Sequence, residues 1–325
     1  MALMVAPRAD LSGSIVPVPA VPVLPAFSAQ TRLLVVAPHP DDETIACGLL
    51  IQRVRAVGGA VKIVLLTAGD TNPWPQRWLE RRLRIGAADR QRWGSRRLAE
   101  LDQALGRLDV PSSALQTLGW PDMGVTDVLL RTSSCAAAEL AAAMRDFRPD
   151  IVAMPSIDDR HPDHGSAHVL TRLALAQLPD APLQLAYLVH GRATHDGLVE
   201  VAGTPGQAAS KSQALHAYRS QMALSGSRLR RLAGRAECYA PVTPAHSHAL
   251  PWHPPAWLQP WLCFSLVDRT SVQTWPWSKA PLCRDDAGRY RLALPQTGYV
   301  GRRFARLACS FPSLWIFDCW GWCEL

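Results

Sequence analysis

Residues 33–43 read LLVVAPHPDDE: five apolar residues, a turn containing two prolines, and three carboxylates in succession. A short unbroken apolar run is typical of a strand that is buried on both faces of a sheet. A helical pattern starts directly after this stretch, at Thr44, and continues to about Val57. A buried strand, a polar turn and a helix in this order indicate the start of an α/β fold.

The same alternation of strand and helix recurs along the chain. Further strands are predicted at Val61–Thr67, Ala114–Leu118, Ile151–Pro155 and Leu183–Val189. Helical patterns cover Gln76–Leu108 (with a possible break near Gly94), Ala136–Phe147, Gly165–Leu178 and Gln207–Ala233. Apolar strands that alternate with helices predict a Rossmann-like α/β fold, with a mostly parallel sheet and helices on both faces.

The composition changes twice, which divides the chain into three parts. Residues 1–30 are rich in proline and predict an extended arm, and residues 31–239 carry the α/β pattern. Residues 240–325 hold eight of the twelve tryptophans and predict a β-rich extension, with strands at Leu262–Val267, Tyr290–Leu294 and Ser313–Phe317. We expect these tryptophans to pack in a core; the alternative is an aromatic cap beside the substrate pocket.

The net charge of +7 does not indicate nucleic-acid binding. Only three of the 34 basic residues are lysines, and the arginines are dispersed. The densest basic stretch, residues 77–97, also contains Glu80 and Asp89 and is typical of a solvated helix face. An anionic sugar, a lipid phosphate or an acidic surface would suit the charge as well, so no nucleic-acid partner is expected.

The cysteines and the amino-terminal residues indicate in which cellular compartment the protein is expected. The eight cysteines include no C-x-x-C pair, which fits a reducing environment. The first thirty residues lack the basic start and unbroken apolar core of a signal peptide. No run of eighteen apolar residues occurs, so no transmembrane helix is expected. We therefore expect a cytoplasmic protein.

Two polar clusters follow predicted strands, PHPDDE at residues 38–43 and DDRHPDH at residues 158–164. Ligands of parallel sheets bind beyond the carboxyl ends of the strands, where both clusters are expected. Two imidazoles and one carboxylate leave one position of a metal open, which suits a catalytic zinc site. Ferrous iron accepts the same set, so the residue types leave the metal open.

The two clusters are also compatible with other roles. A histidine after a strand is often structural, and an aspartate there often caps the next helix. The protein could also bind metal without catalysis, as a scaffold or carrier. A nucleotide-dependent enzyme is disfavoured, because the first strand-to-helix turn lacks the G-x-G-x-x-G pattern and presents acidic residues instead.

The sequence resembles the LmbE-like or PIG-L-like N-acetylglucosaminyl deacetylases over about residues 32–225. The motifs PHPDDE and HPDH (residues 161–164) stand in the order typical of that family. Supporting matches are Leu66-Thr67-Ala68-Gly69, Arg97-x-x-Glu100, Gly119-Trp120-Pro121-Asp122, Lys211-x-x-Ala214-Leu215 and Tyr218-Arg219-Ser220-Gln221. The resemblance says little about the arm or the tryptophan-rich extension.

The resemblance implies a zinc-dependent hydrolase that removes an N-acetyl or other N-acyl group from an amino sugar or glycoconjugate. It makes His39, Asp42 and His164 the metal ligands and Asp41 the general base. Asp41 and His161 would coordinate no metal in this scheme, and their retention disfavours the scaffold or carrier.

The resemblance also assigns residues around the metal. His161, in its protonated form, would stabilise the oxyanion, with Asp163 as its partner. Arg97 and Asp122 would hold sugar hydroxyls. His168, one helical turn beyond the expected ligand His164, is expected in packing or behind the ligands. The remaining six histidines are expected at the surface or in packing: His190, His195, His216, His246, His248 and His253.

Overall fold

A computed structural model describes residues 24–191, 198–242, 249–293, 301–311 and 317–325. Most of the predicted arm, residues 1–23, lies outside this part. Residues 24–30 form no helix or strand, and Leu24 and Phe27 pack against the core. Among the described residues, no helix is both long and apolar enough to span a bilayer.

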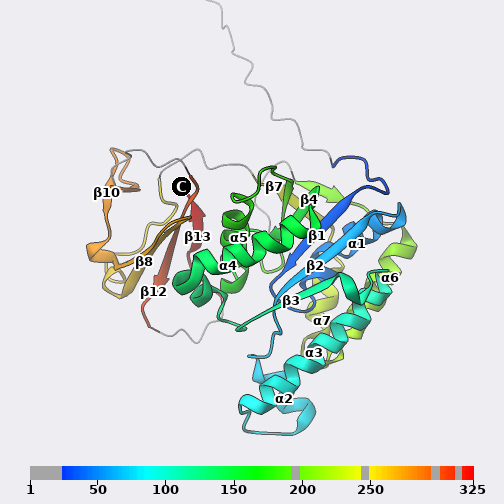
Figure 1. Cartoon of the computed structure of the whole chain (residues 1–325). Coiled ribbons are helices and arrows are strands. Elements are labelled where there is room, and N and C mark those ends of the chain that lie inside the picture. Colours follow the sequence, from blue (N-terminus) through cyan, green and yellow to red (C-terminus); the bar gives the residue numbers. More distant parts are fainter. Residues whose placement is uncertain (1–23, 192–197, 243–248, 294–300, 312–316) are drawn as a thin grey trace, which may run out of the picture.

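The predicted α/β fold is confirmed: in the described part of the chain, seven strands form one mostly parallel sheet (Figure 1). Its order is β3-β2-β1-β4-β5-β7-β6. The first five strands in this order pair in parallel, whereas β7 pairs antiparallel with β5 and β6. The strands span Arg32–Ala37 (β1), Ala60–Thr67 (β2), Leu115–Trp120 (β3), Ile151–Pro155 (β4), Leu183–Tyr187 (β5), Val199–Val201 (β6) and Glu237–Pro241 (β7).

Helices cover both faces of this sheet. They span Asp42–Ala56 (α1), Pro73–Glu80 (α2), Ala87–Arg107 (α3), Val125–Phe147 (α4), Pro162–Leu175 (α5), Pro205–Ala217 (α6) and Arg219–Ala233 (α7). Side chains alternate along β1, as the strand period requires. Leu33 and Val35 pack with α1, α3, α6 and α7, whereas Leu34 and Val36 pack with α4 and α5.

The prediction of one long helix over residues 76–108, broken near Gly94, is wrong about the position of the break. The stretch forms two helices, α2 and α3, and the break lies at residues 81–86 and not near Gly94. Arg81 ends α2 in the left-handed conformation, with φ of 52°. Gly94 lies inside α3, where an added Cβ would come within 3.0 Å of the Ala68 side chain. The glycine therefore permits close packing and does not break the helix.

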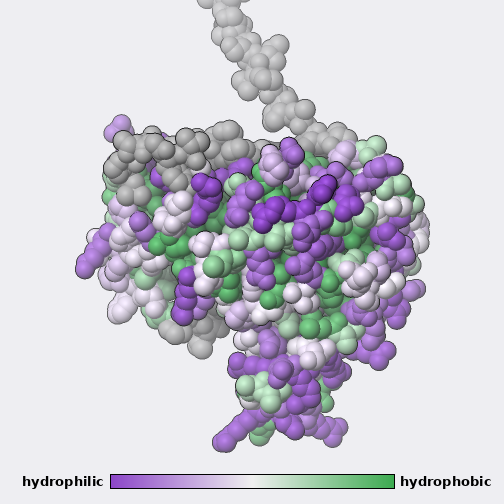
Figure 2. All heavy atoms as spheres, in the orientation of Figure 1, coloured by the Kyte–Doolittle hydropathy of each residue, from purple (hydrophilic) through white to green (hydrophobic). Residues whose placement is uncertain are grey.

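The lobe that carries α2 projects from the body in Figure 1 and is covered largely by hydrophilic residues in Figure 2. Arg82 pairs with Asp89 at 2.7 Å, and Arg92 pairs with Glu80 at 2.6 Å. The arginines of this stretch are mostly exposed, as expected of a solvated face.

Two other helices differ from the prediction. The single helix expected over residues 207–233 is divided at Tyr218 into α6 and α7. Tyr218 leaves the helical conformation, with ψ of 59°, and its side chain is buried. The helix expected to begin at Ala136 begins at Val125, because α4 continues across a kink at Thr132.

The carboxyl-terminal region is β-rich and antiparallel. A four-stranded sheet has the order β13-β12-β8-β9, and β10 pairs with β11. The strands span Leu262–Asp268 (β8), Val272–Pro276 (β9), Leu282–Arg284 (β10), Tyr290–Leu292 (β11), Arg303–Cys309 (β12) and Gly321–Glu324 (β13). Short 3₁₀ turns occupy Ser112–Ala114, Gln259–Trp261 and Trp277–Lys279. The strand predicted at 313–317 lies outside the described residues except for Phe317.

This region shares a core with the α/β part. Val267, Phe304 and Trp322 pack in one cluster with α4 and α5, and the Trp322 indole donates a hydrogen bond to Ser166 Oγ at 3.1 Å. Three of its tryptophans are buried: Trp252, Trp277 and Trp322. Among its described residues, only Phe317 lines the pocket described below. Packing therefore accounts for the buried tryptophans.

Candidate active site

The two polar clusters meet at the carboxyl ends of β1 and β4, which are hydrogen-bonded neighbours in the sheet. The turn after β1 carries residues 38–41 and leads into α1, and His161 caps the amino end of α5. Together they line a cavity of about 480 Å³. The edge of the sheet predicted to hold the site therefore holds a pocket.

Three of the predicted ligand atoms converge. The Nδ1 atom of His39 lies 3.3 Å from Asp42 Oδ2, which in turn lies 3.2 Å from His164 Nε2. The two nitrogens are 3.4 Å apart. Atoms that bind a tetrahedral zinc ion at about 2.0–2.2 Å are roughly 3.3–3.6 Å from one another. The spacing of this donor set fits such an ion.

Carboxylates lie behind both of these imidazoles. His39 Nε2 is 3.3 Å from Asp122 Oδ1 and 3.2 Å from Asp163 Oδ2. His164 Nδ1 is 3.1 Å from Asp159 Oδ2. A carboxylate behind a histidine fixes the ring so that its other nitrogen faces a metal. Asp159 was not predicted as a site residue, although it belongs to the quoted DDRHPDH cluster.

The charges of the cluster favour a bound cation. Burial opposes the ionisation of Asp42, but the charges and hydrogen bonds of His164 and His39 outweigh it and hold its pKa well below the usual range. Burial also opposes protonation of His164, but Asp159 and Asp42 raise its pKa to about 10. In the absence of a metal, protons on the imidazoles thus balance the buried carboxylates, and a metal cation would take over that role.

Asp41 occupies a strained position next to Asp42. Its φ of 112° is unusual for a residue with a side chain, and such strain is found at functional sites. Burial raises its pKa to about 7, with Asp42 and Glu43 adding to the rise against the charge of Arg97. The Asp41 amide donates to Glu43 Oε2 at 3.1 Å, and Tyr218 donates its hydroxyl to Glu43 Oε1. Glu43 and Tyr218 were not predicted to support the site.

Arg97 and Asp122 line the pocket, but their contacts are with the protein. Arg97 donates to the carbonyls of Gly69 and Pro40 and lies 3.5 Å from Asp41 Oδ2. The second carboxylate oxygen of Asp122 accepts from the Thr71 amide at 2.6 Å. These contacts orient the Asp41 turn and the His39 ring, and the binding of sugar hydroxyls by the two residues stays a prediction.

The predicted pairing of His161 with the Asp163 carboxylate is wrong. His161 Nδ1 accepts a hydrogen bond from the Asp163 backbone amide at 3.2 Å. The Asp163 carboxylate contacts His39 and accepts from the amides of Met123 and Val125 at 2.8 and 3.1 Å. Burial, with the neighbouring imidazoles of His39, His164 and His190, lowers the pKa of His161 to about 2. Both observations favour a neutral ring that carries its proton on Nε2.

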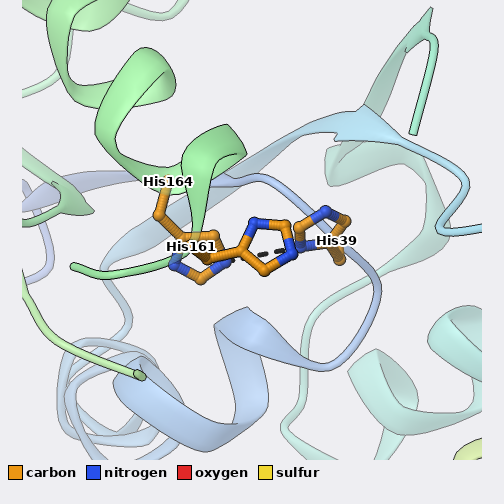
Figure 3. A group of neighbouring side chains, drawn as sticks. All are labelled: His39, His161 and His164. Carbon is orange, nitrogen blue, oxygen red and sulfur yellow. Dashed lines mark hydrogen bonds between the residues drawn. The ribbon is translucent and has the colours of Figure 1, made fainter. Parts of the chain in front are cut away.

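Figure 3 shows His161 and His164, from the start of α5, facing His39 across the site. The ring centroids of His39 and His161 are 4.7 Å apart. His168 does not join them: its buried ring contacts the carbonyl of Pro155 at 2.8 Å, as a packing residue would.

His190 was expected at the surface or in packing, and this is wrong. It lines the pocket, and its ring centroid is 5.0 Å from that of His164. Asp42, His164 and His190 each offer a ligand atom within 4.8 Å of the others, so His190 is a further candidate ligand. Its place just beyond a predicted strand was the available signal. Arg228 and Phe317, which also line the pocket, belong to no motif recognised in the sequence.

Comparison with known protein families matches residues 34–175 to the family described as "PIG-L: GlcNAc-PI de-N-acetylase". A 1D-myo-inositol 2-acetamido-2-deoxy-alpha-D-glucopyranoside deacetylase of Thermobifida fusca (strain YX) is 34% identical over 170 residues, 47% of this chain and 57% of that protein. A protein of the same name from Mycobacterium leprae (strain Br4923) is 34% identical over 165 residues, 46% and 52% of the two chains. The chain thus spans about half the length of these relatives.

Among solved structures, the zinc-inhibited form of teicoplanin deacetylase Orf2 is similar in fold. Its TM-score is 0.51 at 17% sequence identity, and the match covers 64% of this chain and 97% of the other. At this level of identity the similarity concerns the fold alone.

Proposed function

We propose that this protein is a metal-dependent hydrolase that removes an N-acetyl group from an amino sugar or glycoconjugate, in keeping with the match of residues 34–175 to the PIG-L family model. The observation that carries the proposal is the convergence of His39, Asp42 and His164 within 3.4 Å of one another, next to the buried carboxylate of Asp41. A zinc ion on these three residues would supply Lewis acidity to the acyl carbonyl and to the attacking water.

Asp41 is proposed as the base that accepts a proton from that water. A general base is most effective when its pKa lies near the working pH, and burial brings the pKa of Asp41 to about 7. Arg97 fixes the turn that carries Asp41 through the carbonyls of Pro40 and Gly69. The carboxylate would then return the proton to the departing amine.

His161 is proposed to donate a hydrogen bond to the oxyanion that forms at the acyl carbon. Its Nδ1 is occupied by the Asp163 amide, so the Nε2–H of the neutral ring is the available donor. A preorganised donor of this kind stabilises charge that develops only in the transition state. Asp163, behind His39, is proposed as a positioning residue for the ligand ring.

The relatives support an N-acetylated glucosamine conjugate as the substrate class, since both are named deacetylases of a 2-acetamido-2-deoxy-glucopyranoside. All eight cysteines are free, which supports a reducing compartment such as the cytoplasm. The alternative, a metal-binding scaffold without catalysis, would give no reason for Asp41 to hold a strained backbone beside the ligands.

Acetate release from a panel of N-acetylglucosamine conjugates tests the proposal, using protein stripped of metal and then reloaded with zinc or ferrous iron. We expect release that depends on metal and is about 10²–10⁴-fold slower in Asp41→Asn. Metal binding without acetate release from any conjugate would favour the scaffold.

A further inference from the structure

A second hollow of about 190 Å³ adjoins the reaction pocket and is lined by four arginines: Arg160, Arg228, Arg231 and Arg235. The two hollows share the side chains of His190, Arg228 and Phe317. Arg160 follows β4 in the DDRHPDH cluster, and the other three come from α7 and the turn after it. Residues distant in the sequence thus place four cations at one side of the pocket.

The contacts of three of these arginines, Arg160, Arg228 and Arg235, do not neutralise them. The guanidinium groups of Arg160 and Arg228 lie 5.9 and 5.8 Å from the Phe317 ring centroid. Arg228 also donates to His190 Nδ1 at 3.0 Å, and Arg235 donates to the Gly191 carbonyl at 3.3 Å. Within the described ranges, no carboxylate forms an ion pair with any of the four arginines.

This arrangement differs from that of the other dense group of arginines, on the α2 lobe. There Arg82 and Arg92 pair with Asp89 and Glu80. Around the second hollow, the four exposed arginines gather without such a partner in the described ranges, so their positive potentials add and favour the binding of an anion. Guanidinium groups bind phosphate and carboxylate oxygens in pairs of hydrogen bonds, so such an anion would be recognised by geometry as well as charge.

We infer that these four arginines form an anion subsite, which selects an amino sugar that carries a phosphate or a carboxylate beside the acyl group to be removed. The inference rests on the proposed function and names its substrate class. The His190 ring lies between the two parts of the site, 5.0 Å from the His164 ring and within hydrogen-bond distance of Arg228. An anionic group on the same sugar or on the adjoining one can therefore reach the arginines.

Binding of the deacetylated sugars tests the subsite without turnover. Calorimetry would compare glucosamine, glucosamine 1-phosphate and muramic acid, which differ in carrying no anion, a phosphate or a carboxylate. We expect wild type to bind at least one anionic sugar about tenfold or more tightly than glucosamine, the usual effect of one or two charged hydrogen bonds. The anionic sugar that binds more tightly identifies the group that the subsite takes.

The matched variants are Arg228→Gln combined with Arg231→Gln, and Arg230→Gln as the control. Arg230 lies on the same helix and is exposed, but it does not line either hollow. We expect the double variant to lose the preference for the anionic sugar and the control to keep it. Equal binding of all three sugars by wild type, or an equal loss in the control, would overturn the subsite.

Turnover separates this inference from the proposed function. If wild type releases acetate from N-acetylglucosamine and from its 1-phosphate with equal kcat/KM and binds all three sugars equally, the function stands and the subsite fails. If the binding preference depends on Arg228 and Arg231 but no acetate is released, the subsite stands and the proposed function fails.

Discussion

The Nδ1 atom of His39 lies 3.4 Å from the Nε2 atom of His164, although 125 positions separate the two residues in the chain. The contact exists because β1 and β4 are neighbours in a parallel sheet, so the turns that follow them open at the same edge. Metal binding at this point would therefore join the two strand ends, and removing one imidazole should affect the metal before it affects the fold.

We predict that His164→Ala loses the bound metal and stays folded. Removing one of three protein ligands leaves too few donors for a stable site. Metal content after dialysis, measured beside circular dichroism, tests this. The control is His168→Asn, one turn further along α5 and also buried, which should keep the metal. A His164→Ala protein with a full complement of metal would show that the ligand set is wrong.

Replacement by asparagine should have different effects on metal binding at the neighbouring residues Asp41 and Asp42. Asp42→Asn should weaken metal binding, whereas Asp41→Asn should retain metal and lose activity by about 10²–10⁴-fold, the usual contribution of a positioned general base. In wild type, kcat/KM should fall as the pH drops through about 7, because burial raises the pKa of Asp41 to that value and the protonated form cannot act as a base. Near-normal turnover of metal-loaded Asp41→Asn would exclude Asp41 as the base.

We predict that Asp159 supports metal binding, although its side chain is not expected to contact the substrate. Its carboxylate lies 3.1 Å from His164 Nδ1 and accepts from the amides of Val189 and His190, both at 2.9 Å. We predict that Asp159→Asn lowers metal affinity or activity by about 10–100-fold, as is usual for partners of ligand histidines. Competition with a chelator measures the affinity. Asp158→Asn, at the exposed neighbouring position, is the control, and an equal effect in both would contradict this role.

We predict that the free energy of unfolding falls at acidic pH, in part because the buried His168 resists protonation. Burial lowers the pKa of this imidazole to about 4, whereas an unfolded histidine titrates near 6.5. The unfolded chain therefore takes up a proton first, and stability is lost as the pH falls from about 6.5 towards 4. Between pH 7 and 5 the loss should be about 2 kcal/mol.

The His168→Asn variant isolates this loss, because an asparagine amide can still donate to the Pro155 carbonyl but does not titrate. Denaturant unfolding at pH 7 and pH 5 should show a smaller change for the variant than for wild type. Equal changes in the two proteins would mean that His168 does not contribute to the acid sensitivity.

The packing of the carboxyl-terminal sheet can be tested at one side chain. Trp322 is buried against α5, where its ring faces Gly165 and Ser166. We predict that Trp322→Ala lowers the free energy of unfolding by about 3–5 kcal/mol. Trp257→Ala, at a side chain that is 74% exposed, should change it by less than about 0.5 kcal/mol. A small effect at Trp322 would show that this contact contributes little.

The sequence by itself determined the α/β fold and the edge of the sheet that holds the site. Unbroken apolar runs such as residues 33–37 require burial on both faces, and a parallel sheet with helices on both sides provides it. The polar residues that follow two of these runs then had to meet at one edge. These conclusions depend on local patterns, which a single sequence carries.

Only the tertiary structure decided which side chains contact one another across the site. Asp163 lies two positions from His161, yet its carboxylate turns to His39, because the amides of Met123 and Val125 fix it there. Arg228 of α7 lines the pocket, and the start of that helix is held by Tyr218, whose hydroxyl bonds to Glu43, a contact between residues 175 positions apart. Such partners are selected by packing over the whole core, and periodicity and motif spacing contain no information about them.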